Sequence, residues 1–129
     1  MHSYIGGERL RILYSLLMLR KAKVFMYETL TGILSENEDS YSFAYDSSYL
    51  ASKDAESISL TLPLSVQPHQ SKIIFPFFDG LIPEGWLLEI AEKNWKLNPR
   101  DRMGLLLACC HDCIGAVSIQ EMTAGRGKE

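Results

Sequence analysis

Hydrophobic and polar residues alternate in several short stretches of the first half of the chain, a pattern typical of half-buried β-strands. Residues 22–28 are rich in strand-forming side chains, and a turn at residues 31–32 is expected to lead into a second strand at residues 33–34. Residues 41–45 alternate strictly and place three aromatic rings on one face. Residues 58–64 also alternate, with four aliphatic side chains on one face. These patterns predict an antiparallel sheet.

The segments between these strands have weak periodicity and are interpreted as connections. Residues 46–56 are small and polar, with room for one helical turn near Tyr49 and Leu50. Residues 67–71 are expected to form a loop, and residues 72–76 a short extended segment.

Helical spacing replaces alternation in the second half. A first helix is predicted from Pro83 to about residue 95, where Pro83 fits the first turn and Glu84 favours the positive end of the helix dipole. A second helix is predicted with Asn98 as its N-cap, Pro99 at the first position and Asp101 at the third. Its expected buried stripe consists of Met103, Leu106, Leu107 and Cys110.

A final buried strand is expected at residues 114–119. Strands, two helices and a last strand predict an α+β fold, in which a small antiparallel β-sheet has two helices packed on one face. We expect one domain over residues 22–120, preceded by an N-terminal extension, residues 1–21, that is helical or lies before the true start. A disordered tail is expected at residues 121–129.

Composition narrows the possible classes of protein. At 47% hydrophobic residues, 129 residues are enough for one core without disulfides. A net charge of -3 gives no general attraction to phosphate backbones. A direct nucleic-acid-binding module therefore stays an alternative, but the basic excess that usually marks such modules is missing. The apolar stretch at residues 10–19 is too short and too charged to span a bilayer, and it lacks a signal-peptide cleavage site. A cytoplasmic protein is expected.

Three clustered cysteines are the only candidate for metal or thiol chemistry. Cys110 and Cys113 flank His111 at a zinc-like spacing, but the chain offers no second pair of ligands. With Cys109 they form an odd set, which fits buried thiols in a reducing compartment. Neither a Walker loop nor a kinase-type glycine loop occurs. We therefore expect no cofactor, no metal and no catalysis, with an autonomous thiol or metal enzyme as the alternative.

Trp86 is the best candidate for a contact with another protein. It lies at the border of the apolar arc of the first helix, directly after Gly85. A tryptophan at such a border can point outward and anchor an interface, or it can complete the core, and the spacing leaves both open.

The residues at 77–85, FFDGLIPEG, resemble the FFDxLLPEG signature of the N-terminal subdomain of HipA-type serine/threonine kinases. Residues 43–45, residues 58–64 and residues 105–119 resemble further motifs of this subdomain. The closing motif departs from the family at Cys110, where a glycine is usual. The kinase residues of the family have no counterpart here, so the resemblance covers about residues 22–120 alone.

The resemblance implies a role in a bacterial toxin-antitoxin system, where such kinases are the toxins. In a tripartite version the toxin is divided into a shorter kinase, HipT, and a small protein, HipS, and the chain resembles the HipS type. The implied function is an antitoxin that binds and inhibits a HipT-type kinase, in a complex with a HipB-type helix-turn-helix protein through which any DNA contact is indirect. The residues expected to face the kinase are Asp79, Gly80, Leu81, Ile82, Pro83, Glu84, Gly85 and Trp86.

Overall fold

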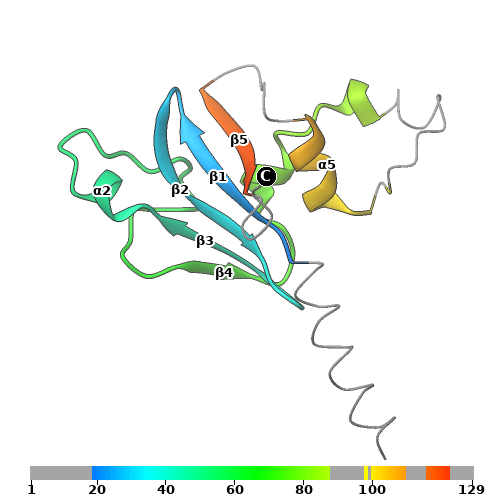
Figure 1. Cartoon of the computed structure of the whole chain (residues 1–129), viewed down its shortest axis with the longest axis horizontal. Helices are drawn as coiled ribbons and strands as arrows, with labels where there is room; N and C mark the ends of the chain where they lie inside the picture. The colour runs from blue at the N-terminus through cyan, green and yellow to red at the C-terminus, as the bar shows by residue number, and fades with distance from the viewer. Residues whose placement is uncertain (1–18, 88–97, 99, 110–115, 123–129) are drawn as a thin grey trace, which may run out of the picture.

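A single antiparallel sheet forms the centre of the protein in the computed structural model, which describes residues 19–87, 98, 100–109 and 116–122 (Figure 1). Its strands are β1 (Lys21–Met26), β2 (Thr29–Glu36), β3 (Tyr41–Tyr45), β4 (His69–Ser71) and β5 (Val117–Met122). They lie in the order β4-β3-β2-β1-β5, and every neighbouring pair is antiparallel. The strand that is last in the sequence therefore pairs with the first.

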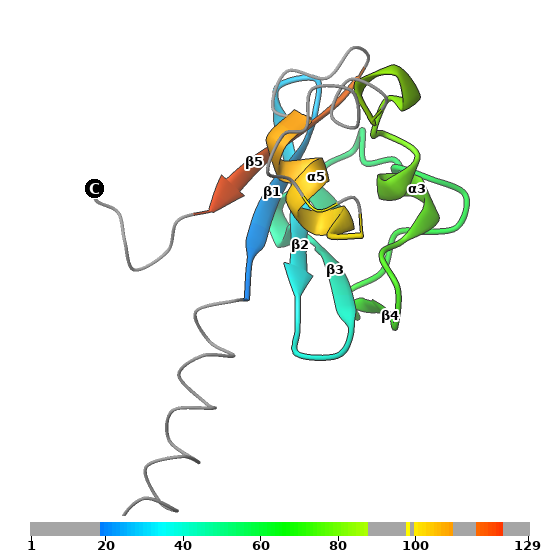
Figure 2. The ribbon, with the colours of Figure 1, turned by 90° about the vertical axis from the view of Figure 1, so that its right-hand side faces the viewer.

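The helices that accompany the sheet include α2 (Ser47–Leu50), α3 (Pro76–Asp79) and α5 (Arg102–Cys109). Figure 2 shows α3 and α5 on the same side of the sheet, where they contact each other. The predicted α+β class, an antiparallel sheet with helices on one face, is confirmed. Of the predicted first helix, residues 84–87 are helical and the following residues lie outside the described part of the chain.

The core lies between the sheet and these two helices. The ring of Phe43 in β3 meets the ring of Phe78 in α3 with their centroids 5.5 Å apart, and both side chains are fully buried. Burial of aromatic side chains contributes the most apolar area per residue to such a small core. The other large, fully buried side chains are Leu34, Leu62, Met103, Leu105, Leu106, Ile119 and Val24.

The first hairpin differs from the prediction in the place of its turn. Residues 27–28 connect β1 to β2, and Tyr27 adopts a positive φ of 59°. Thr31 and Gly32, expected to form the turn, lie inside β2 and are buried, so that prediction is wrong. Gly32 is needed for a different reason: a Cβ there would lie 2.7 Å from the ring of Phe43. A glycine inside a strand often marks such a close approach rather than a turn.

Residues 58–64 do not form the predicted strand. Ile58 and Leu62 are buried, but Leu60 is 97% exposed, because a tight turn brings the N–H of Leu62 to the carbonyl of Ser59. The Tyr45 hydroxyl holds this turn by accepting a hydrogen bond from the N–H of Ile58 at 3.0 Å and donating one to the carbonyl of Leu62. Because the chain turns here, alternate side chains no longer lie on one face. The alternation of the sequence therefore does not predict which of these side chains face the core.

The other connections agree with their predictions only in part. The expected loop at residues 67–71 contains β4, a three-residue edge strand that pairs with β3, and the single helical turn expected within residues 46–56 is confirmed by α2. The last strand is placed at Val117–Met122 rather than at residues 114–119, so the first two residues of the expected tail belong to the sheet. Residues 114–115 lie outside the described part of the chain.

The aromatic strand at residues 41–45 behaves as predicted. Phe43 and Tyr45 are buried and Tyr41 packs partly buried against the same cluster, so all three rings point toward the core. The alternation is reliable in this strand because pairing with a neighbour on each side, β2 and β4, holds it as a regular strand.

Candidate functional site

The segment expected to meet a partner begins with a helix that the sequence pattern did not indicate. α3 starts after Phe75 with Pro76 at its first position, and its backbone ends at Gly80. Proline at the first helical position costs no hydrogen bond, since that N–H has no partner within a helix. Phe78 points into the core and Phe77 packs partly buried beside it, with the two ring centroids 5.2 Å apart. The two adjacent aromatics thus fix α3 to the sheet.

After α3 the chain alternates between core and surface. Ile82 was predicted to face a partner, but its side chain is only 5% exposed. It belongs to the core and is not available for such a contact. Leu81 and Trp86 are partly buried and pack against the core cluster. The accessible residues are Gly80, Pro83, Glu84 and Gly85, with Asp79 half-buried. The accessible surface of the segment is therefore a short stretch of mostly small residues that leads to the partly buried Trp86.

An ion pair fixes α3 against α5. The Nε atom of Arg102 donates to Oδ1 of Asp79 at 2.6 Å, and the two residues are separated by 23 positions in the sequence. Both side chains are partly exposed, so the pair contributes little to stability, on the order of 1 kcal/mol or less. Its effect is geometric: it holds the end of α3, and hence the start of residues 80–86, at a fixed place. No local pattern indicated Arg102, because its partner Asp79 lies 23 positions away in the sequence.

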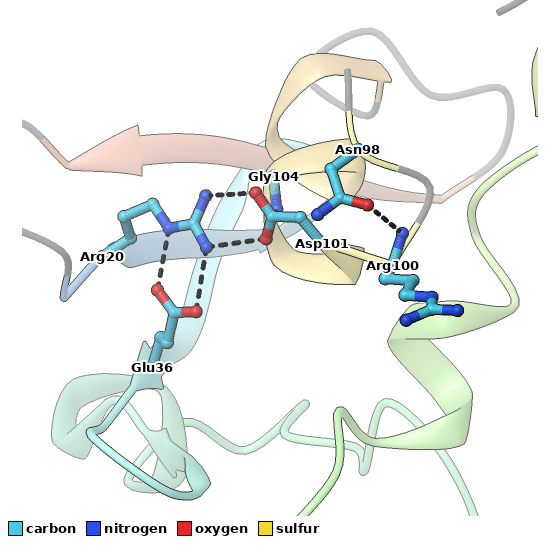
Figure 3. A network of polar contacts seen from close by, with 6 residues as sticks. All are labelled: Arg20, Glu36, Asn98, Arg100, Asp101 and Gly104. Atoms are coloured by element: carbon cyan, nitrogen blue, oxygen red, sulfur yellow. Dashed lines mark hydrogen bonds and ion pairs between the residues drawn. The ribbon is translucent and has the colours of Figure 1, made fainter. Parts of the chain in front are cut away.

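A second network joins the start of β1, the end of β2 and the start of α5 (Figure 3). The Arg20 guanidinium donates to both oxygens of Glu36, at 2.7 and 2.9 Å, and to both oxygens of Asp101, at 3.0 and 2.8 Å. Hydrogen bonds to Glu36 and then to Asp101 raise the pKa of Arg20, and the hydrogen bond from Arg20 lowers the pKa of Asp101. Paired, charge-assisted contacts of this kind stabilise the structure and also fix the relative positions of the groups that they join.

Asp101 also corrects the predicted start of the second helix. The N–H of Gly104 donates to Oδ1 of Asp101 at 3.1 Å, so Asp101 precedes the helix and caps it, whereas it was predicted at the third helical position. Asn98 instead accepts from the N–H of Arg100 at 2.9 Å and forms a turn before the helix. A Cβ at Gly104 would collide with the Asp101 carboxylate, so glycine is required for the network.

The predicted buried stripe of this helix is confirmed in part. Met103 and Leu106 are buried as expected, Leu107 is half-buried, and Leu105 is buried without having been predicted. Cys109 is partly buried, and the rest of the cysteine cluster lies outside the described residues. Within the described ranges no three histidine, cysteine or acidic side chains come together as metal ligands.

Removing the charge of Asp101 is expected to weaken the acid dependence of stability. The folded-state pKa of Asp101 is lowered, so its contribution is present above the unfolded pKa of about 3.9 and is lost as the pH falls through the folded pKa. Asp101→Asn should lower the free energy of unfolding by about 1 kcal/mol at pH 7 and should make stability less sensitive between about pH 5 and pH 3. Urea unfolding across this range measures both effects. The control is Asp39→Asn at an exposed turn; an equal pH response of the two variants would contradict the assignment.

The fold and this surface define a small α+β domain of the kind that forms the N-terminal part of HipA toxins. The solved N-terminal domain of HipA toxin superimposes with a TM-score of 0.65 at 27% sequence identity, over 81% of this chain and 94% of that one. An uncharacterized protein of Haemophilus influenzae (strain ATCC 51907 / DSM 11121 / KW20 / Rd) is 33% identical over 104 residues, which are 81% of this chain and 94% of the relative. The sequence model of the protein family described as HipA N-terminal domain matches residues 22–120. The chain belongs to this family.

None of the described helices has the length and the apolar character that a membrane span requires.

Proposed function

We propose that this protein is an antitoxin that binds a separate HipT-type serine/threonine kinase and suppresses its activity, alongside a HipB-type DNA-binding protein. The observation that carries the proposal is an accessible segment, Pro83 to Gly85, next to the half-buried Trp86, in a domain of the HipA N-terminal family. The relative from Haemophilus influenzae supports it, since the matched region is 94% of that protein. That relative is therefore little more than this domain. The proposal gives the protein no catalysis of its own.

The contacts at Gly85 support an interface at this segment. A Cβ at Gly85 would find nothing within 4 Å, so packing within the described part of the domain does not require a glycine there. The absent side chain instead leaves room beside Trp86 for the backbone of a partner. Tryptophan removes a large apolar area from water with little loss of side-chain entropy, which is why it anchors many interfaces.

We propose that the kinase lies at one end of the sheet, and the arrangement of the strands supports this. β5 ends at Met122, which pairs with Lys21, and Lys21 pairs in turn with Ser35. Tyr41 and Ser71, which are paired, complete the same end of the sheet. The matched domain of HipA toxin is N-terminal, so the rest of that toxin follows its last strand. A detached kinase that binds in the same arrangement would meet this end of the sheet.

Co-expression with the cognate HipT-type kinase tests the proposal. We expect this protein to relieve the growth arrest that the kinase causes and to co-purify with it. A kinase variant without activity should still co-purify, which separates binding from inhibition. Persistent growth arrest and failure to co-purify with either form of the kinase would reject the function.

A further inference from the structure

An open cleft of about 400 Å³ lies at the end of the sheet where β3 begins and β5 ends. It is formed by three parts of the chain: β3, the segment from β4 through α3, and the start of α5. Its lining residues are Tyr41, Lys72, Ile73, Ile74, Pro76, Asp79, Arg100 and Arg102. Asp79 also begins the segment of residues 79–86, so this segment connects the cleft to Trp86 along the chain.

The lining is positively charged, although the whole chain carries a net charge of -3. Lys72, Arg100 and Arg102 are cationic, and Asp79 is the one acidic residue among the lining residues. Asp79 is already paired with Arg102. Glu36 and Asp101 approach Tyr41 from the neighbouring elements, but both carboxylates are held by Arg20. A concentration of positive charge on an acidic protein favours a specific anionic partner over a general polyanion.

Arg100 is placed to reach such a partner. Its backbone N–H is fixed by Asn98, while its guanidinium points away from the Arg20 network, toward the ribbon on the far side of the cleft (Figure 3). Both Arg100 and Lys72 are exposed. The two cations line the cleft from different parts of the chain, one just before α5 and one directly after β4.

The open shape of the cleft and the aliphatic side chain at its rim favour a protein segment over a small molecule as the ligand. Ligand pockets cover most of a small molecule's surface. This cleft is open to solvent, and its lining residues Lys72, Pro76 and Arg100 are exposed. Ile73 is 68% exposed although its neighbour Ile74 is buried, so an aliphatic side chain is fixed at the rim among the charges. A partner that brings both a carboxylate and an apolar side chain would use all of these groups.

We propose that this cleft binds an acidic segment of the partner kinase, with Lys72 and Arg100 pairing its carboxylates and Ile73 contacting an adjacent apolar side chain. The inference rests on the proposed function and adds a second contact region to the Trp86 surface. The cleft lies at the end of the sheet where a detached kinase is expected. A segment of that kinase would therefore be able to reach the cleft.

Charge reversal tests the inference with the full chain and its cognate HipT-type kinase. Lys72→Glu and Arg100→Glu should each lower the affinity for the kinase by about tenfold at low ionic strength, and the loss should shrink as salt screens the charges. Ile73→Ser should weaken binding at all ionic strengths. The matched control is Lys53→Glu, an exposed lysine outside the cleft lining, which should bind as the wild type does.

The outcomes separate the two proposals. If the wild type binds the kinase but the cleft variants bind equally well, the cleft inference is overturned while the antitoxin function stands. If the wild type does not bind the kinase at all, both are overturned. Titration of the isolated chain with inorganic phosphate adds a third arm: saturable binding lost in Arg100→Glu, with unchanged kinase affinity, would make the cleft a small-anion site and reject the acidic segment.

Discussion

Trp86→Ala is expected to weaken binding to the HipT-type kinase by at least about 2 kcal/mol, roughly thirtyfold in affinity. Trp86 is partly buried and packs against the core, and the residue before it, Gly85, is exposed. Truncation removes the largest apolar contact that this surface can make. The fold should persist, because the fully buried side chains of the core do not include Trp86. Titration calorimetry with the kinase measures the loss, and the growth assay should show incomplete neutralisation.

Two further variants show whether this effect is specific to the surface. Tyr27→Asn removes a ring that is 76% exposed in the β1–β2 turn, and asparagine tolerates the positive φ there. It should bind as tightly as the wild type. Gly85→Ala should weaken binding without altering the fold, since it places a methyl group in the space beside Trp86. Normal binding and neutralisation by Trp86→Ala would reject Trp86 as the anchor.

Gly32→Ala is expected to have the largest effect on stability, a loss of about 3 kcal/mol. The new Cβ would lie 2.5 Å from the carbonyl oxygen of Ala44 and 2.7 Å from the ring of Phe43. Neither can move easily, because Ala44 belongs to the β2–β3 ladder and Phe43 is fully buried. Chemical denaturation should show a lower midpoint. Gly85→Ala is the matched control, with open space around its Cβ, and an equal effect of the two substitutions would contradict this explanation.

The fold class could be predicted because the strand at residues 41–45 keeps its side-chain pattern within the sheet. Residues 41–45 are held between two strands, so alternation translates directly into burial of Phe43 and Tyr45. Residues 58–64 have an equally regular pattern but are stabilised by the Tyr45 hydroxyl rather than by a ladder of strand hydrogen bonds. Hydrophobic alternation alone does not distinguish these two cases.

The candidate site was predictable only where its residues are neighbours in the sequence. The motif at residues 77–85 indicated the surface segment, and the border position of Trp86 agrees with its partial burial. Arg20 meets Asp101 across 81 positions, and no local pattern indicates such a pair. Gly104 was the one available signal, because a glycine inside a predicted helix suggests that another group approaches closely.

The pairing of β5 with β1 has a consequence for how the protein is made. Until Val117–Met122 has been synthesised, β1 has an unpaired edge, which in a nascent chain is a site for aggregation or for chaperone binding. The sheet is completed only once Val117–Met122 has been synthesised. Newly made protein should therefore become able to neutralise a kinase late, after the last strand has left the ribosome.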